Sequence, residues 1–173
     1  VVGVDPAATS KAGSDDTGII AAGKDGAGQY YVLGDYTLHD TPRKWGEAAI
    51  TAYHKHKANL IVGETNQGGE MVEHTIKTID SNIPFRAVHA SRGKATRAEP
   101  VSALYEQGKV KHFGAFPELE DQLCEWVPGA EKSPDRLDAL VWAISFLMNI
   151  GTQQQFYDST PVYAVSRGGG MRI

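Results

Sequence analysis

The first hydrophobic positions of the chain fall into three short runs separated by polar residues and glycines. Residues 1–5 carry three valines around a glycine, and this β-branched composition favours a buried strand that ends where Pro6 removes the next backbone N–H. Further apolar runs at 17–22 and 29–37 flank a turn of Gly, Asp and Lys at 24–28. Three strands joined in this way predict an antiparallel meander.

After the meander the chain alternates between helical and strand patterns. Thr41 and Pro42 have the residue types of a helix N-cap and first position, and an apolar stripe at helical period follows them. Strands that alternate with helices are typically parallel, because each helix crosses back over the sheet. The later predicted elements are strands at 60–63 and 85–89 and helices at 70–79, 95–107, 117–126 and 133–149, the last capped by Ser133.

These elements predict an α/β domain with a mixed central sheet, an antiparallel meander followed by parallel strands, flanked by helices. The chain has 173 residues, of which 41% are hydrophobic, enough for one domain with a core. We expect this domain to span residues 1–150 and the Gln-, Ser- and Gly-rich stretch 151–173 to be a flexible tail or interaction arm. The chain begins without Met inside a strand pattern, so we expect it to be part of a longer protein.

Composition narrows the function classes. The single cysteine, Cys124, cannot form an internal disulfide, and no Cys/His cluster has zinc spacing, which fits a reducing compartment. We expect no membrane segment and no secretion, because there is neither a run of 18 apolar residues nor a signal peptide. No stretch matches the phosphate loop of ATPases, so an ATPase partner would have to lie outside this sequence.

Three carboxylates lie next to apolar segments, where an acid is costly to bury unless it is paired or bound to a metal. Asp5 ends the first strand, Glu64 follows the apolar run at 60–63, and Asp138 lies within the apolar helix at 133–149. An aspartate at a strand end is often only a turn former, so Asp5 alone would not identify a site. The recurrence of three such acids favours one shared site.

Asp135 and Asp138 are three positions apart and share a helix face. The helix dipole explains an acid at Asp135, whereas we expect Asp138 to lie past the first turn, where no cap or dipole requires an acid. Carboxylates gathered in one site repel one another, and a divalent cation usually relieves the repulsion. Oxygen ligands without Cys or convergent His favour Mg²⁺ or Mn²⁺, and two such ions can promote phosphodiester hydrolysis.

The charge of the chain is unevenly distributed. The formal net charge is -4, yet the segment 86–111 carries six Lys or Arg against two Asp or Glu. A charged run is most often a solvated face. A metal-dependent enzyme that acts on a polyanion would also combine one basic segment with acids elsewhere in the chain.

The order of these elements and acids resembles the RNase H-like nuclease superfamily. A closer likeness joins six short segments, whose ordered set resembles the C-terminal nuclease domain of a tailed-phage terminase large subunit over residues 1–149. The segments are Gly3-Val4-Asp5-Pro6-Ala7, Ser14-Asp15-Asp16-Thr17-Gly18-Ile19, Ile61-Val62-Gly63-Glu64, Gly93-Lys94-Ala95-Thr96-Arg97-Ala98-Glu99-Pro100-Val101, Leu104-Tyr105-Glu106-Gln107-Gly108-Lys109-Val110 and Ser133-Pro134-Asp135-Arg136-Leu137-Asp138-Ala139-Leu140.

The resemblance implies an endonuclease that cuts concatemeric viral DNA at the start and end of head filling. It implies that Asp5, Glu64 and Asp138 are catalytic and bind Mg²⁺ or Mn²⁺, with two ions expected. Asp135 would be an auxiliary ligand, as would Asp16, which serves equally well as a turn residue.

The resemblance also gives the basic segment a role. Lys94 and Arg97 lie where a helix begins, so cationic side chains and backbone N–H groups there can hold a DNA phosphate without reading bases. Arg92 and Lys109 are the further expected DNA contacts. The implied partners are double-stranded DNA, an ATPase domain of the same full-length chain, the portal protein and the terminase small subunit, in the host cytoplasm at the procapsid portal.

Two alternatives share parts of this pattern. A Holliday-junction resolvase or another RNase H-like nuclease would carry the same acids. A DNA or portal docking module on a decayed nuclease fold would need no metal, although the presence of all three acids argues against it.

Overall fold

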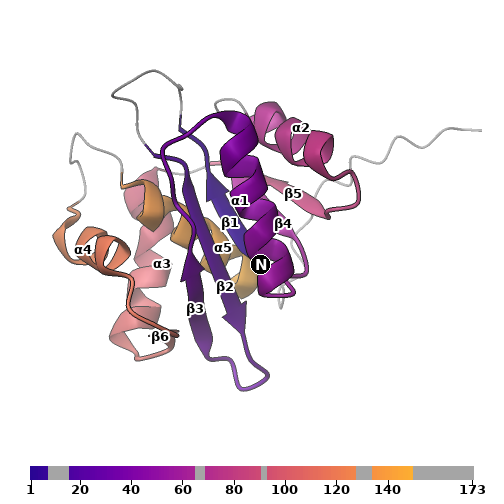
Figure 1. The fold of residues 1–173 in the computed structure, drawn as a ribbon. Helices are drawn as coiled ribbons and strands as arrows, with labels where there is room; N and C mark the ends of the chain where they lie inside the picture. The colour runs from indigo at the N-terminus through magenta and orange to yellow at the C-terminus, as the bar shows by residue number, and fades with distance from the viewer. Residues whose placement is uncertain (8–15, 65–68, 91–92, 128–133, 150–173) are drawn as a thin grey trace, which may run out of the picture.

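The computed structural model describes residues 1–7, 16–64, 69–90, 93–127 and 134–149 (Figure 1). The predicted tail at 151–173 and the predicted cap Ser133 lie outside these residues. In chain order the elements are β1 (Val2–Asp5), β2 (Gly18–Lys24), β3 (Tyr30–Asp35), α1 (Pro42–Lys55), β4 (Ile61–Glu64), α2 (Gly69–Ile79), β5 (Phe85–Val88), α3 (Lys94–Glu106), β6 (Val110–His112), α4 (Pro117–Glu125) and α5 (Asp135–Asn149).

The six strands form one mixed sheet in the order β5-β4-β1-β2-β3-β6. β1, β2 and β3 are joined as an antiparallel meander, and β4 and β5 add to β1 in parallel. The α/β class, the meander and the parallel half of the sheet are confirmed.

Two hydrophobic cores cover the two faces of the sheet. Side chains alternate along a strand, so Val2 and Val4 of β1 pack on one face against α1 and α2. On the other face Ile20 and Ala22 of β2 pack with α3, α4 and α5. Figure 1 shows α1 and α2 on one side of the sheet and α3, α4 and α5 on the other.

The structure corrects two expectations. β6, which pairs in parallel with β3, was not predicted. The strand has only three residues, and the middle one is a lysine, so the sequence shows no apolar run there. Asp138 was expected past the first turn of its helix, but α5 begins at Asp135 and Asp138 lies within that turn. The helix dipole therefore favours both acids.

Thr41 occupies the predicted N-cap of α1 in extended conformation, although its side chain makes no capping hydrogen bond. Within the described part of the chain, we find no helix with the length and apolar character needed to cross a membrane.

Candidate functional site

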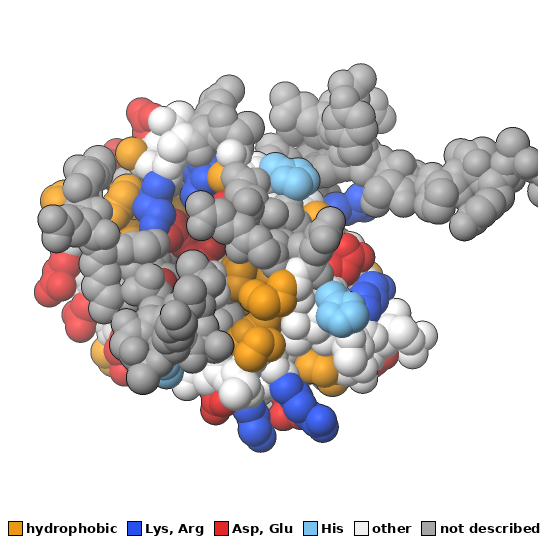
Figure 2. All heavy atoms as spheres, turned by 90° about the horizontal axis from the view of Figure 1, so that it is seen from above, with side chains coloured by type: hydrophobic (Ala, Val, Ile, Leu, Met, Phe, Trp, Pro, Cys, Tyr) orange, Lys and Arg blue, Asp and Glu red, His pale blue; other side chains and the backbone are white. Residues whose placement is uncertain are grey.

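The strands place two of the three predicted acids side by side. β1 and β4 are parallel neighbours whose last paired residues are Val4 and Gly63, so Asp5 and Glu64 end adjacent strands at the same edge of the sheet. Figure 2 looks from above onto the end of the molecule toward which β1 points, and shows Asp and Glu side chains beside Lys or Arg side chains there.

Two glycines bring the third acid to this edge. A Cβ atom on Gly3 would collide with the carbonyl oxygen of Ala139, and a Cβ atom on Gly18 with that of Asp135. The backbone of α5 therefore lies directly on β1 and β2, with no side chain between them. Because α5 begins at Asp135, its first turn and Asp138 lie beside the end of β1.

The acids act on one another electrostatically. Burial raises the pKa of Asp5 well above its usual value, and the charges of Asp138 and then Glu64 raise it further. The ammonium of Lys94 acts in the opposite direction, while Asp135 adds a smaller repulsion. Asp5, Glu64, Asp138 and Asp135 thus share one local electrostatic field, as a single site requires.

Lys94 supplies the positive charge of this cluster. It is the first residue of α3, and its ammonium forms an ion pair with the carboxylate of Asp138. The Asp138 side chain is only 5% exposed, so the ion pair offsets part of the cost of burying the carboxylate. Lys94 is therefore positioned at the carboxylates as well as at the start of the predicted phosphate-binding helix.

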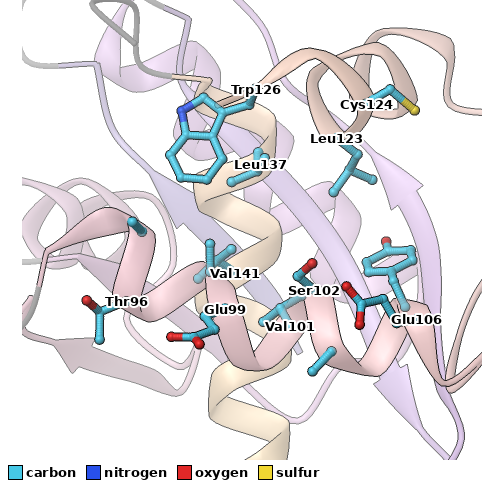
Figure 3. Close-up of a pocket in the computed structure, with 14 residues that line it drawn as sticks. Thr96, Glu99, Val101, Ser102, Glu106, Leu123, Cys124, Trp126, Leu137 and Val141 are labelled. Atoms are coloured by element: carbon cyan, nitrogen blue, oxygen red, sulfur yellow. The ribbon is translucent and has the colours of Figure 1, made fainter. Parts of the chain in front are cut away.

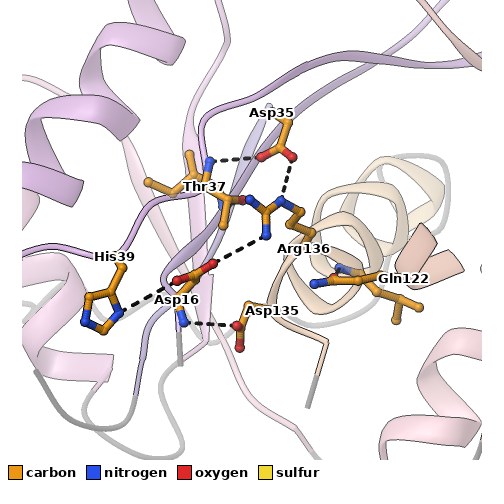
Figure 4. A network of polar contacts seen from close by, with 9 residues as sticks. Asp16, Asp35, Thr37, His39, Gln122, Asp135 and Arg136 are labelled. Carbon is orange, nitrogen blue, oxygen red and sulfur yellow. Dashed lines mark hydrogen bonds and ion pairs between the residues drawn. The ribbon is translucent and has the colours of Figure 1, made fainter. Parts of the chain in front are cut away.

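A second polar network fixes Asp16 against the start of α5 (Figure 4). The backbone N–H of Asp16 donates to Oδ2 of Asp135 at 3.0 Å. Its carboxylate lies 3.4 Å from Nη1 of Arg136, and Nε of the same arginine donates to Oδ2 of Asp35 at 2.9 Å. Nδ1 of His39 lies 3.7 Å from the Asp16 carboxylate. Asp16 is thus tied to Asp135, its expected auxiliary partner.

Arg136 and Asp35 belong to this region although the sequence pattern did not predict them there. Asp35 lies 101 positions before Arg136, so their ion pair has no local signal. One indirect signal existed. A cation in the first turn of a helix is opposed by the dipole, so Arg136 needed an acidic partner from elsewhere.

The structure separates the expected DNA contacts. Arg97 stacks its guanidinium over the ring of Trp142, 4.4 Å from the ring centroid, and is partly buried. Lys109 follows the far end of α3, a helix of 13 residues that begins at Lys94 and spans roughly 20 Å at about 1.5 Å per residue. Arg92 lies outside the described residues.

The donor set fits Mg²⁺ or Mn²⁺ in chemistry, since Asp5, Glu64 and Asp138 offer carboxylate oxygens only. Among the residues that the structure describes, however, no group of three or more His, Cys, Asp or Glu side chains has the spacing of a formed metal site. The acids share one edge of the sheet, and at least one of them, Asp138, is held by the ammonium of Lys94.

Comparisons with known proteins agree with this architecture. A family model described as a terminase RNaseH-like domain matches residues 2–147. RuvC of Thermus thermophilus is similar in fold in two structures, one of them in complex with a Holliday junction substrate. The complex shares 13% identity, with a TM-score of 0.51 over 88% of this chain and 97% of that one.

The other RuvC structure shares 14% identity, with a TM-score of 0.51 over 88% of this chain and 98% of that one. The yeast mitochondrial Holliday junction resolvase shares 14% identity at a TM-score of 0.49, over 82% of this chain and 75% of that one. A search of curated proteins gave no match.

Proposed function

The chain belongs to the family of terminase RNaseH-like domains, and from this premise we propose that it is a metal-dependent endonuclease that cuts concatemeric viral DNA during genome packaging. The family and the fold support a nuclease of the RNase H-like superfamily. The finer statement, cleavage with little sequence preference at the start and end of head filling, is our proposal.

One observation carries the proposal. The carboxylate of Asp5 is partly buried, and the charges of Asp138 and Glu64 raise its pKa although the fold gains no stability from that repulsion. Acids gathered where their charges repel one another are typical of functional sites, because a structural role does not require like charges to lie together.

Each acid has a proposed role in holding metal. Asp5, Glu64 and Asp138 would be the ligands of Mg²⁺ or Mn²⁺, with Asp135 and Asp16 as auxiliary acids. Two bound ions would supply activation of a water and stabilisation of the leaving oxygen of the phosphodiester. A metal ion binds Asp5 in its ionised form. Because the pKa of Asp5 is raised, protons compete with the metal ion, and metal binding weakens as the pH falls.

The protein groups around the acids would hold and position the DNA. Lys94 lies at the carboxylates, where a cation can contact the phosphate next to the scissile bond. Arg97 would reach a phosphate only by leaving the ring of Trp142. Arg92 and Lys109 remain proposed contacts farther along the duplex.

The partners are proposed from the same family membership. Double-stranded DNA is the substrate, and an ATPase domain of the same full-length chain moves it. The portal protein and the terminase small subunit complete the assembly, which places the reaction at the procapsid portal in the host cytoplasm.

A second candidate is cleavage of branched DNA. The observation that favours it is the fold shared with RuvC, one structure of which contains a Holliday junction substrate. A resolvase would cut a four-way junction much faster than a linear duplex of the same sequence, whereas a packaging nuclease would not distinguish the two. A docking module without catalysis is the remaining candidate, and it would cut neither.

The test is cleavage of supercoiled plasmid by the purified chain with Mg²⁺, with Mn²⁺ and with EDTA. We expect nicking and linearisation that EDTA abolishes and that Asp5→Asn and Asp138→Asn each reduce by at least about 100-fold. Asp121→Asn on the exposed side of α4 is the matched control and should cleave as the unchanged chain does. Cleavage that survives both substitutions would refute the assignment of the site.

A further inference from the structure

A groove of about 840 Å³ lies between α3, α4 and α5, and the proposed nuclease site does not use it (Figure 3). We define the α3–α4 groove by its lining residues. They are Ala95, Thr96, Ala98, Glu99, Val101, Ser102, Ala103, Tyr105 and Glu106 of α3, Leu123 and Cys124 of α4 with the following Trp126, and Leu137 and Val141 of α5.

The floor of the groove is apolar, and the groove is about as long as a short helix. Leu137 and Val141 lie one turn apart on α5, and Val101 is buried beside them. The lining residues of α3 run from Ala95 to Glu106, which spans roughly 16 Å at about 1.5 Å per residue. This length matches about three turns of a bound helix.

The charge at the groove is negative. Glu99 and Glu106 are exposed lining residues seven positions apart, about two helical turns, and no Lys or Arg is among the lining residues that the structure describes. α4 adds four acids and no basic residue over Pro117–Glu125. A DNA phosphate would be repelled here, so this surface is unsuited to the proposed substrate.

We propose that the α3–α4 groove binds a basic amphipathic α-helix of a partner protein. The apolar face of such a helix, with residues at i, i+3, i+4 and i+7, covers Leu137, Val141 and Trp126, as helices do in hydrophobic grooves. Its flanking Lys or Arg residues, two turns apart, face Glu99 and Glu106, and this charge complementarity selects a basic partner. The inference goes beyond the proposed nuclease function and does not depend on it.

The probe is a labelled, end-capped 14-residue peptide of Leu and Lys in an amphipathic pattern, titrated against the 173-residue chain by fluorescence anisotropy. The comparison peptide carries Glu in place of every Lys and keeps every Leu. We expect saturable binding of the Lys peptide and none of the Glu peptide at the same concentrations. Equal binding of both peptides, or no binding of the Lys peptide, would overturn the proposal.

Variants separate the groove from the net charge of the protein. We expect Glu99→Lys and Glu106→Lys each to weaken binding by about fivefold or more, because an attraction becomes a repulsion. Glu73→Lys makes the same charge change on α2, on the other face of the sheet, and should change the affinity by less than about twofold. An equal loss of peptide affinity in Glu73→Lys would show that the attraction is nonspecific and would contradict binding at the groove.

A steric variant tests the groove without changing charge. Ser102 is exposed and lines the groove, so Ser102→Phe should fill it and weaken Lys-peptide binding by about tenfold while thermal unfolding stays cooperative. Unchanged binding in Ser102→Phe would contradict the proposal. So would sedimentation that shows a dimer of the chain alone, lost in Ser102→Phe, because the occupant would then be a second copy.

Discussion

At the residue scale, Asp5 shows the conflict between stability and the proposed function. Its carboxylate is partly buried and lies near two other acids, so the folded protein favours its protonated form. We expect Asp5→Asn, in the absence of divalent ions at pH 7.5, to stabilise the protein by about 1 kcal/mol, or roughly 2–4 °C in Tm for a domain of this size. Thermal unfolding measures this, with the exposed Asp121→Asn as control; a lower Tm in Asp5→Asn would contradict it.

The pH dependence of this difference follows from the direction of the pKa shift. The unfolded chain releases the Asp5 proton near the usual pKa of 3.8, whereas the folded chain holds it to a higher pH. The folded state therefore loses stability as the pH rises from about 4 through the raised pKa. We expect the Tm gap between Asp5→Asn and the unchanged chain to be small near pH 4 and to widen toward pH 7.5. A gap independent of pH would contradict the assigned cause.

Arg136 is a residue whose importance only the folded structure reveals. It joins Asp16 and Asp35, and it is 17% exposed, so these ion pairs are partly protected from water. We expect Arg136→Met to destabilise the protein by about 1–3 kcal/mol, because two acids lose their cation. Arg43→Met removes an exposed pair with Glu47 and should cost at most about 0.5 kcal/mol in the same denaturant titration. Equal losses of unfolding free energy in the two variants would show that the Arg136 ion pairs stabilise the protein no more than an exposed pair does.

At the element scale, the close approach of α5 to the sheet determines where Asp138 lies. Gly3 and Gly18 leave room for the α5 backbone, so we expect Gly18→Ala to destabilise the protein by about 1–3 kcal/mol. Gly26→Ala, in a turn where the added carbon meets nothing within 4 Å, is the control and should be close to neutral. Chemical unfolding compares them, and a neutral Gly18→Ala would mean that α5 does not lie this close.

The sequence predicted elements better than it predicted their contacts. Long periodic segments such as α1 and α5 have local signals, whereas β6 has three residues and depends on pairing with β3. The carboxylates were recognisable as acids beside apolar runs. The ion pair of Lys94 with Asp138 and the stacking of Arg97 on Trp142 were not, because tertiary packing alone brings these side chains together.

At the scale of the whole molecule, the overall negative charge limits the affinity for DNA. The net charge is -4, so we expect the isolated chain to bind duplex DNA weakly through a few phosphate contacts. With two or three such contacts, raising the salt concentration from 50 to 200 mM would lower the affinity by about 10- to 50-fold. Filter binding at both salt concentrations measures this, and a tight complex that is insensitive to salt would contradict it.

The central claim is that Asp5, Glu64 and Asp138 together hold the catalytic metal, and diffraction from crystals grown with Mn²⁺ tests it most directly. We expect anomalous density for Mn²⁺ between the three carboxylates, with Lys94 displaced from Asp138, and loss of that density in Asp138→Asn. Mn²⁺ bound only at other acids, in a protein that still cleaves DNA, would contradict the claim.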